Sequence, residues 1–297
     1  MALLALVAAC VASLDASHAA VSATDDAGNV VTLARPALRI VSLAPHATEI
    51  LFAAGAGDRV VGVVAHSDYP PEARKLARVG DANALDLERI FALAPDLVVA
   101  WPYTMPSQLA TLRARGATTF VSDPKTIAGI ASDIEALGVL AGTEAVAHSN
   151  ADALRTRLAA LSARYQRAKP IRVFYEVWHE PLQTIGGAHL ISQAIALCGG
   201  ANVFGAQTLA APSVSFEAVA AARPEAIVGG SDDGTRPKWL DEWKRLPDIP
   251  AVRYDNLFAA NGDLMHRSGP RFVAGVEALC ATLDAARANR QRMSGRR

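Results

Sequence analysis

The amino-acid sequence predicts an α/β fold: two similar α/β lobes with mostly parallel sheets, joined by one long rigid helix. Short apolar runs typical of buried strands alternate with helical segments in two parts of the chain, and this alternation is typical of parallel sheets covered by helices. A stretch without strand signals separates the two parts, and one motif occurs once in each of them. At 297 residues the chain is also long for a single core, so two domains are expected.

The first part, residues 21–143, is expected to form the N-terminal lobe. Residues 25–33 indicate a hairpin that turns near residues 27–29. Strands are then expected at residues 39–43, 59–64, 96–100 and 118–121, and helices at residues 49–54, 87–93 and 107–115.

The middle of the chain predicts the linking helix, residues 144–168. Residues 144–167 contain neither Gly nor Pro, and Leu154, Leu158, Leu161 and Tyr165 recur at helical spacing. A helix of that length spans about 35 Å, enough to join two lobes. One more packing helix of a single domain is the alternative.

The C-terminal lobe is expected to occupy residues 169–297. After Pro170 the alternation resumes. Strands are expected at residues 171–178 and 226–228, and helices at residues 190–197, 216–222 and 270–287.

The first 20 residues predict a secretory signal peptide, because they are apolar and rich in small side chains, with a possible cleavage site at residues 17–19. A lipid anchor at Cys10 is the less favoured alternative. A buried helix is disfavoured because the polar, turn-rich residues 24–29 follow at once. No later apolar run approaches the ~20 residues of a membrane span. We therefore expect an exported, periplasmic protein.

Charge and motifs exclude several classes of function. The 29 basic and 29 acidic residues balance and form no basic stripe, so nucleic acid is not an expected partner. Neither a Gly-x-Ser-x-Gly elbow, nor a His-Glu-x-x-His helix, nor a phosphate loop is present, so an enzyme is not expected. Outside the signal peptide, Cys198 and Cys280 remain; in an exported protein they favour a disulfide over two buried free thiols.

The repeated motif relates the two lobes. Residues 87–99 and 216–228 both read apolar, Glu, any, apolar, any, Ala, two more residues, Pro, acidic, any, apolar, Val. Pro95 and Pro224 are expected to end a helix, after which the chain enters the sheet. A second, looser match joins residues 55–62 to residues 198–205. Duplicated units in this order predict two lobes with a cleft between them.

Glu88 and Glu217 occupy the same place in the two copies. Each is near a helix N-terminus, where a carboxylate is favoured by the helix dipole, so simple capping is the alternative for either copy alone. Two matched copies on symmetric lobes favour a paired surface feature for a two-fold partner.

Five stretches of this sequence resemble the periplasmic cobalamin-binding proteins of ABC importers, a group whose lobes are joined by a rigid helix. They are residues 67–71, 86–90, 94–101, 197–204 and 267–271, and the resemblance extends over residues 39–283. It implies a monomer that captures cobalamin or a related corrinoid in the inter-lobe cleft and delivers it to the importer's membrane subunits. The corrinoid is then the transported ligand, and no cofactor is expected.

The resemblance also implies roles for particular residues. In that family one glutamate from each lobe docks onto arginines of the two transporter subunits, and Glu88 and Glu217 stand at those positions. A disulfide of the second lobe matches Cys198 and Cys280.

The cleft matches the family less well. Trp101 falls on an aromatic position, Asp263 and Arg267 on polar positions, and Pro45 and His46 in the loop whose backbone approaches the ligand. Other aromatic positions of the family hold His66, Ala82, Gln183 and Ala211 here, so Trp178 and Tyr103 are candidate replacements. A less aromatic cleft fits a corrinoid without some side groups; the alternative is a haem, siderophore or metal receptor.

The residues themselves support part of this assignment. Trp101 and Trp178 each follow a strand, at the carboxyl end where α/β sheets present ligands. Asp263 and Arg267 are expected to pair, with His266 beside them. The expected ligand contacts are therefore Pro45, His46, His66, Trp101, Trp178, Gln183, Asp263, His266 and Arg267.

Other candidates are set aside. Trp239 and Trp243 are spaced by four and flanked by charge, which is typical of an amphipathic helix face. The histidines form no ligand pair at close helical spacing, so no metal site is expected, and His179 and His189 are interpreted as ordinary surface or loop residues.

Overall fold

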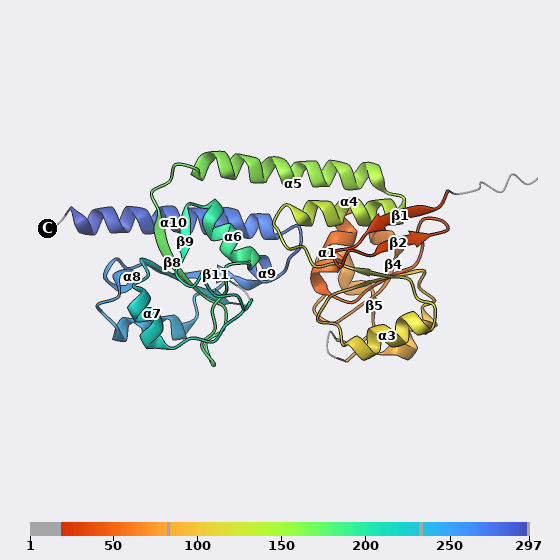
Figure 1. The fold of residues 1–297 in the computed structure, drawn as a ribbon, viewed down its shortest axis with the longest axis horizontal. Coiled ribbons are helices and arrows are strands. Elements are labelled where there is room, and N and C mark those ends of the chain that lie inside the picture. Colours follow the sequence, from red (N-terminus) through yellow and green to blue (C-terminus); the bar gives the residue numbers. More distant parts are fainter. Residues whose placement is uncertain (1–18, 82–83, 232–233, 296–297) are drawn as a thin grey trace, which may run out of the picture.

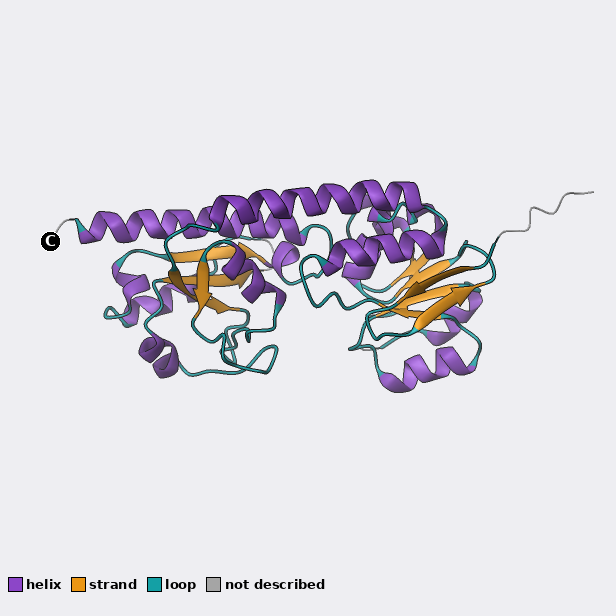
Figure 2. Cartoon of the chain, turned by 45° about the horizontal axis from the view of Figure 1, so that its top comes forward, coloured by secondary structure: helices purple, strands orange, loops and turns teal. Residues whose placement is uncertain are grey.

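Two α/β lobes lie side by side, and one long helix, α5, lies across both (Figure 1). The computed structural model describes residues 19–81, 84–231 and 234–295. The expected signal peptide, residues 1–20, lies outside these residues except for its last two positions. Cys10, the alternative lipid anchor, also lies outside them. Figure 2 shows both sheets on the same side of α5. The predicted fold class is confirmed.

The N-terminal lobe contains the elements up to α4. They are β1 (Val21–Thr24), β2 (Val30–Leu33), β3 (Ile40–Ser42), α1 (Pro45–Ala53), η1 (Gly57–Arg59), β4 (Val60–Val63), η2 (Pro71–Lys75), β5 (Ala77–Arg78), α2 (Leu87–Ala92), β6 (Leu97–Ala100), α3 (Pro106–Ala114), β7 (Thr119–Val121) and α4 (Gly129–Ala141).

The C-terminal lobe follows α5 (Glu144–Tyr165). Its elements are β8 (Ile171–Glu176), α6 (Leu190–Leu197), β9 (Gly200–Asn202), α7 (Phe216–Ala222), β10 (Ala226–Ser231), η3 (Lys238–Arg245), α8 (Pro250–Arg253), β11 (Leu257–Asn261), α9 (Gly262–Met265) and α10 (Phe272–Ser294).

The two main sheets repeat one topology. Among the described residues, the N-terminal sheet has the order β5-β4-β3-β6-β7 and the C-terminal sheet the order β9-β8-β10-β11 when read in the same direction. Every neighbouring pair in both sheets is parallel. Strand β6, which follows α2, therefore corresponds to β10, which follows α7. The duplication read from the sequence is present in the strand order.

The repeated motif performs the same structural task in both lobes. Ala94 and Arg223, the residues before the two prolines, adopt left-handed φ angles of 44° and 48° and end α2 and α7. The next acidic residue then binds the start of a neighbouring strand: Asp96 accepts hydrogen bonds from the amides of Leu38 and Arg39 at 2.8 and 2.9 Å. Glu225 accepts the amide of Arg172 at 3.0 Å. The acidic position of the motif is thus structural.

Helix α5 contacts both lobes. It packs on α4 and α1 in the first lobe and on α10 and α6 in the second. Side-chain contacts join it to α10: the Arg157 guanidinium lies 2.8 Å from Glu277, the Tyr165 hydroxyl donates to Asp284 at 2.8 Å, and Arg164 lies 3.7 Å from Asp284. The helix is therefore held along its length.

Cys198 and Cys280 form a disulfide, as predicted, which excludes the free thiols. It joins the C-cap of α6 to α10, and both cysteines are fully buried.

Candidate functional site

The site lies where the carboxyl ends of the two parallel sheets approach each other, the edge at which open α/β sheets present ligands. Ion pairs across the seam show the approach: Asp68, in the loop after β4, contacts Arg267, which follows α9. A second contact joins Gln193 of α6 to the main chain of Lys125 and Ile127 in the first lobe.

The wall of the N-terminal lobe presents Trp101. The residue follows β6 in a tight turn, in which the Thr104 amide donates to the Trp101 carbonyl and the Trp101 amide donates to the Thr104 hydroxyl. The rings of Tyr103 and His46 pack against the indole in edge-to-face geometry, at 4.6 and 5.6 Å between centroids. Tyr103 is 66% exposed, so this aromatic group opens to solvent.

His46 lies beneath Trp101 and is only 5% exposed. Burial lowers the pKa of His46 to about 4, so the ring is neutral near pH 7. Its Nε2 lies 3.2 Å from the Ser122 carbonyl, which can only accept, so Nε2 carries the proton. The ring therefore supports Trp101, and the expected polar contact of His46 with a ligand stays a prediction.

The wall of the C-terminal lobe contains a cavity of about 370 Å³ at the ends of β8 and β10. Its described lining is Val177, Trp178, His179, Glu180, Gly230, Ser231, Trp239 and His266. Trp178 is 60% exposed, and its indole Nε1 donates to the Glu180 carbonyl at 2.8 Å. This hydrogen bond fixes the orientation of a large aromatic surface at the cleft.

Trp239, set aside above as part of an amphipathic helix face, also lines this cavity. Its ring stacks on His179 at 4.9 Å and 12°. Burial raises the pKa of Glu176, but His179 Nδ1 and Trp243 Nε1 each lie 2.7 Å from one of its oxygens. Trp243 is fully buried, as expected for a core residue. The sequence signal for His179 is its place shortly after β8, whereas Trp239 lies within η3 and has no such signal.

Two glycines of β10 make room for this wall. A side chain at Gly229 would place its first carbon 2.5 Å from the Trp239 ring, and one at Gly230 would lie 2.6 Å from the His266 ring. The Tyr175 hydroxyl lies 3.1 Å from His266 Nε2. The Gly-Gly pair at a strand end was the signal that the sequence offered for this close approach.

The remaining predicted contacts lie in loops at the same edges. Pro45 begins α1, and His66, with a φ of 62°, follows β4. Gln183 exchanges main-chain hydrogen bonds with Val177 and Trp178, so it shapes the loop that carries Trp178. His189, interpreted as a surface or loop residue, lies in the loop before α6, where its ring accepts the amide of Ile191 and caps the helix.

An interlobe ion cluster closes the seam. It consists of Glu49 and Asp68 from the first lobe and Asp263, Arg267 and Arg271 from the second. Arg267 lies 2.6 Å from Asp68, 2.7 Å from Asp263 and 3.7 Å from Glu49. Arg271 lies 2.6 Å from Glu49 and covers the Tyr69 ring at 4.1 Å.

Glu49 is the most deeply buried member of the cluster, with 3% of its surface exposed. Burial raises the pKa of Glu49, and the guanidinium groups of Arg271 and Arg267 oppose that effect. The predicted pairing of Asp263 with Arg267 is present, whereas the roles of Glu49, Asp68 and Arg271 were not foreseen.

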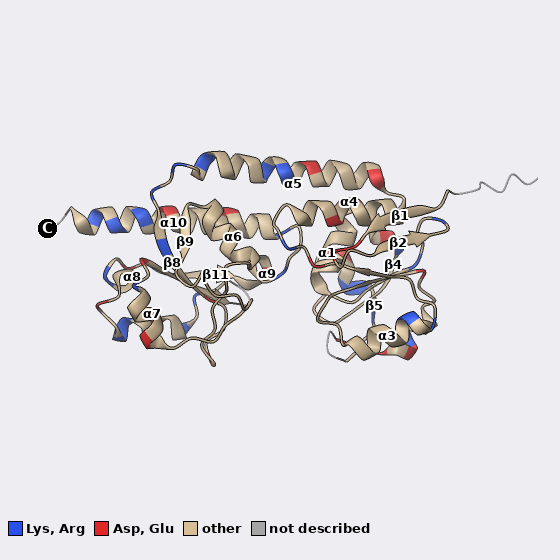
Figure 3. Ribbon diagram, in the orientation of Figure 1, with Lys and Arg blue, Asp and Glu red and all other residues tan. Residues whose placement is uncertain are grey.

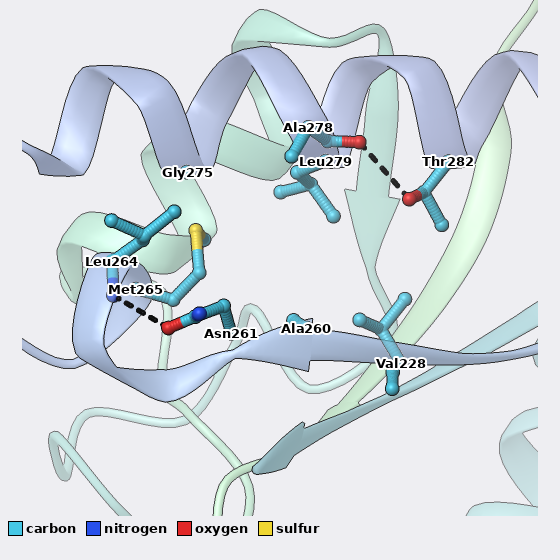
Figure 4. Close-up of a pocket in the computed structure, with 10 residues that line it drawn as sticks. Val228, Ala260, Asn261, Leu264, Met265, Gly275, Ala278, Leu279 and Thr282 are labelled. Atoms are coloured by element: carbon cyan, nitrogen blue, oxygen red, sulfur yellow. Dashed lines mark hydrogen bonds between the residues drawn. The ribbon is translucent and has the colours of Figure 1, made fainter. Parts of the chain in front are cut away.

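Outside this region, the described residues offer no metal site, and the second cavity is small. In the part of the chain that the structure describes, no three His, Cys, Asp or Glu side chains are grouped to hold a metal ion. A second cavity, of about 60 Å³, lies between β11, α9 and α10 (Figure 4). Its lining is mainly apolar, and the polar groups of Asn261 and Thr282 are hydrogen-bonded within it, so it is a packing defect. None of the described helices is long and apolar enough to cross a bilayer.

Glu88 and Glu217 are both exposed at the second position of their helices. The capping task is performed by their neighbours, because Asp86 accepts the Arg89 amide at 2.9 Å and Ser215 accepts the Ala218 amide at 3.2 Å. Helices α2 and α7 lie on the edge of the molecule away from α5 (Figure 1). Elsewhere, acidic and basic residues are interspersed over both lobes (Figure 3).

Two lobes with parallel sheets and a helix that contacts both lobes are the features of a substrate-binding protein. Residues 40–264 match the family of periplasmic binding proteins, and the chain belongs to that family. The vitamin B12-binding protein of Vibrio cholerae is 39% identical over 252 residues, which cover 84% of this chain and 91% of that relative.

Solved structures show the same likeness. The periplasmic vitamin B12 binding protein BtuF of Vibrio cholerae is 38% identical and has a TM-score of 0.77, with 85% of this chain and 98% of that chain covered. The apo form of the periplasmic haem-binding protein RhuT from Roseiflexus sp. RS-1 is 28% identical, with a TM-score of 0.73 and coverage of 84% and 98%. The resemblance read from the sequence is confirmed.

Proposed function

We propose that this chain captures cobalamin or a related corrinoid in the cleft between its lobes and delivers it to an ABC importer. The observation that carries the proposal is an exposed aromatic group at the carboxyl edge of each sheet, Trp101 with Tyr103 on one lobe and Trp178 with Trp239 on the other. Flat aromatic faces suit a large macrocycle because stacking removes much apolar area from water. The vitamin B12-binding relatives point to the same ligand class.

The expected polar contacts surround these walls. His66, Gln183 and His266 lie in loops of the carboxyl edges, while Asp263 and Arg267 lie at the seam. Pro45 would approach the ligand through its backbone, and His46 would act through Trp101. The proposal keeps the predicted division into lobes at residues 21–143 and 169–297, joined by the linking helix at residues 144–168.

Delivery would use Glu88 and Glu217. Their equivalent positions, their exposure and the capping of both helices by other residues support a role outside the fold itself. A two-fold importer could bind one glutamate with each subunit. The protein would act as a periplasmic monomer without catalysis, since a carrier returns its ligand unchanged.

Haem is the second candidate, because a haem-binding protein shares the fold at 28% identity. Titration calorimetry of the exported chain with cobalamin, cobinamide and haem separates the candidates. We expect cobalamin to bind with at least 100-fold higher affinity than haem. Haem binding without cobalamin binding would overturn the proposed ligand and leave the fold assignment intact.

The aromatic walls are tested by Trp101→Ala and Trp178→Ala. Each should weaken cobalamin binding by up to about 10-fold, because one stacking contact of roughly 0.5–1.5 kcal/mol is lost. Met293→Ala, at an exposed position of α10 outside the cavity lining, serves as the control.

A further inference from the structure

The interlobe ion cluster bears on which macrocycle the cleft accepts. Cobalamin carries amide groups around its ring, whereas haem and the acid precursors of corrinoids carry carboxylates. A carboxylate that loses water on entering a cleft needs a cation or several donors to replace it. The question is therefore whether the cleft offers a positive charge.

The arginines of the seam are already neutralised. Asp68 and Asp263 bind the two ends of the Arg267 guanidinium at 2.6 and 2.7 Å, and Glu49 binds Arg271 at 2.6 Å. Three carboxyl groups thus face two guanidinium groups within the cluster. Whether Glu49 is ionised or protonated, no positive charge is left over.

A further cation, the exposed Arg74, lies beside the cluster, where its Nε donates to the Asp68 main-chain carbonyl at 3.1 Å. The described residues that line the cavity of the C-terminal lobe include Glu180 but neither Lys nor Arg. On the other lobe, the Arg78 guanidinium donates to the main-chain carbonyls of Val64 and Ser67, in the loop after β4, at 3.1 and 3.0 Å. Its hydrogen bonds therefore serve the loop.

The same carboxylates suit amides. A carboxylate offers about four acceptor sites, so Asp68 and Asp263 keep acceptor capacity beyond their bonds to Arg267. Their side chains are 41% and 40% exposed, while that of Arg267 is 17% exposed. A ligand at the seam thus meets acceptors before it meets the guanidinium group.

We propose that the interlobe ion cluster withdraws Arg267 from acidic groups of the ligand, so that the cleft selects corrinoids with amide substituents over those with carboxylates. Asp68 and Asp263 are the specificity-determining residues, and Arg267 is a positioning residue that holds them. This inference rests on the proposed function and adds the chemistry of the ring substituents to it.

The test compares cobalamin with cobalamin whose ring propionamides have been hydrolysed to carboxylates, by calorimetry on the exported chain at pH 7. Wild-type protein should bind the amide form at least 30-fold more tightly. Asp68→Asn combined with Asp263→Asn should narrow this ratio at least 10-fold, because Arg267 becomes available to the carboxylates. Glu277→Gln, which removes the partner of Arg157 on α10 away from the cleft, should leave the ratio unchanged.

The outcomes separate the two proposals. Equal affinity of wild-type protein for both forms, or an unchanged ratio in the double variant, would overturn the selection by charge while cobalamin binding still supports the function. Absence of cobalamin binding would overturn the function and this inference together. Both substituted side chains are partly exposed, and circular dichroism verifies that the double variant is folded.

Discussion

Asp133 shows how one buried residue makes the whole fold sensitive to pH. It lies on α4, 3% exposed, and accepts the Ser122 hydroxyl at 2.5 Å. Burial, with the charge of Asp26 nearby, raises its pKa from 3.8 to about 8. The folded protein therefore keeps a proton that the unfolded chain has already lost above pH 4.

This proton makes stability fall as the pH rises from about 4 to about 8. Over that window the folded state binds more protons, so the free energy of unfolding decreases by up to about 1.4 kcal/mol per pH unit. Asp133→Asn, which mimics the protonated form, should flatten the profile and raise the stability at pH 8. Urea unfolding at pH 5, 6.5 and 8 measures it.

The matched control for this change is Asp152→Asn, since Asp152 is an exposed carboxylate on α5 that pairs with Arg155 at 3.1 Å. Its unfolding profile should follow that of the wild type. Parallel profiles for Asp133→Asn and the wild type would show that Asp133 is ionised in the folded protein.

At the scale of elements, the acidic residue after each proline of the repeated motif, Asp96 or Glu225, accepts amide hydrogen bonds from the start of a neighbouring strand. Asp96→Ala removes the acceptor for two strand amides at the start of β3. We expect a loss of about 1–3 kcal/mol in the free energy of unfolding, with ligand affinity unchanged. Asp58→Ala, at an exposed site in η1, should stay within about 0.5 kcal/mol of the wild type. An equal loss in both variants would contradict the role of Asp96.

The disulfide between Cys198 and Cys280 also links two elements, α6 and α10. It closes a sequence separation of 82 residues between α6 and α10. Replacement of Cys198 and Cys280 by Ala should lower the free energy of unfolding by about 2–5 kcal/mol. Dithiothreitol should shift the wild type in the same direction and leave the double variant unaffected; thermal melts with and without the reductant measure both effects.

Most elements could be predicted from the sequence because their apolar runs or helical periods are self-contained. Strand β5, of two residues, and strand β9, Gly200–Asn202, carry too few apolar side chains to give a pattern. Strand β11 was missed because its apolar run, Leu257–Asn261, is half-buried and rich in Ala. In these strands pairing with a neighbour, which the local sequence does not encode, decides the conformation.

The site was less predictable for a similar reason. The repeat and the strand ends located Trp101, Trp178 and the glutamates, since those signals are local. Arg267 and Asp68 are 199 residues apart in sequence, and their contact depends on how two lobes are placed. Trp239 was missed because its role follows from Gly229, whose lack of a side chain matters only once the sheet has formed.

At the scale of the whole molecule, the two exposed glutamates define a test of delivery. Glu88→Arg with Glu217→Arg should leave cobalamin affinity within 2-fold and reduce uptake of limiting cobalamin by cells that depend on this chain by at least 10-fold. Glu144→Arg, at the first turn of α5 on the other side of the molecule, is the control. Normal uptake in the double variant would reject these glutamates as docking contacts.

The lobes are joined at two separated places, by α5 and by the ion pairs across the seam. A body held in this way bends little, so the width of the cleft is set before a ligand arrives. Capture then requires little loss of conformational entropy, and the dwell time of the ligand depends on how often the seam loosens. An importer that bound α2 and α7, as proposed above, would act on both lobes at once, and any movement between its two contacts would loosen the seam and shorten the dwell time.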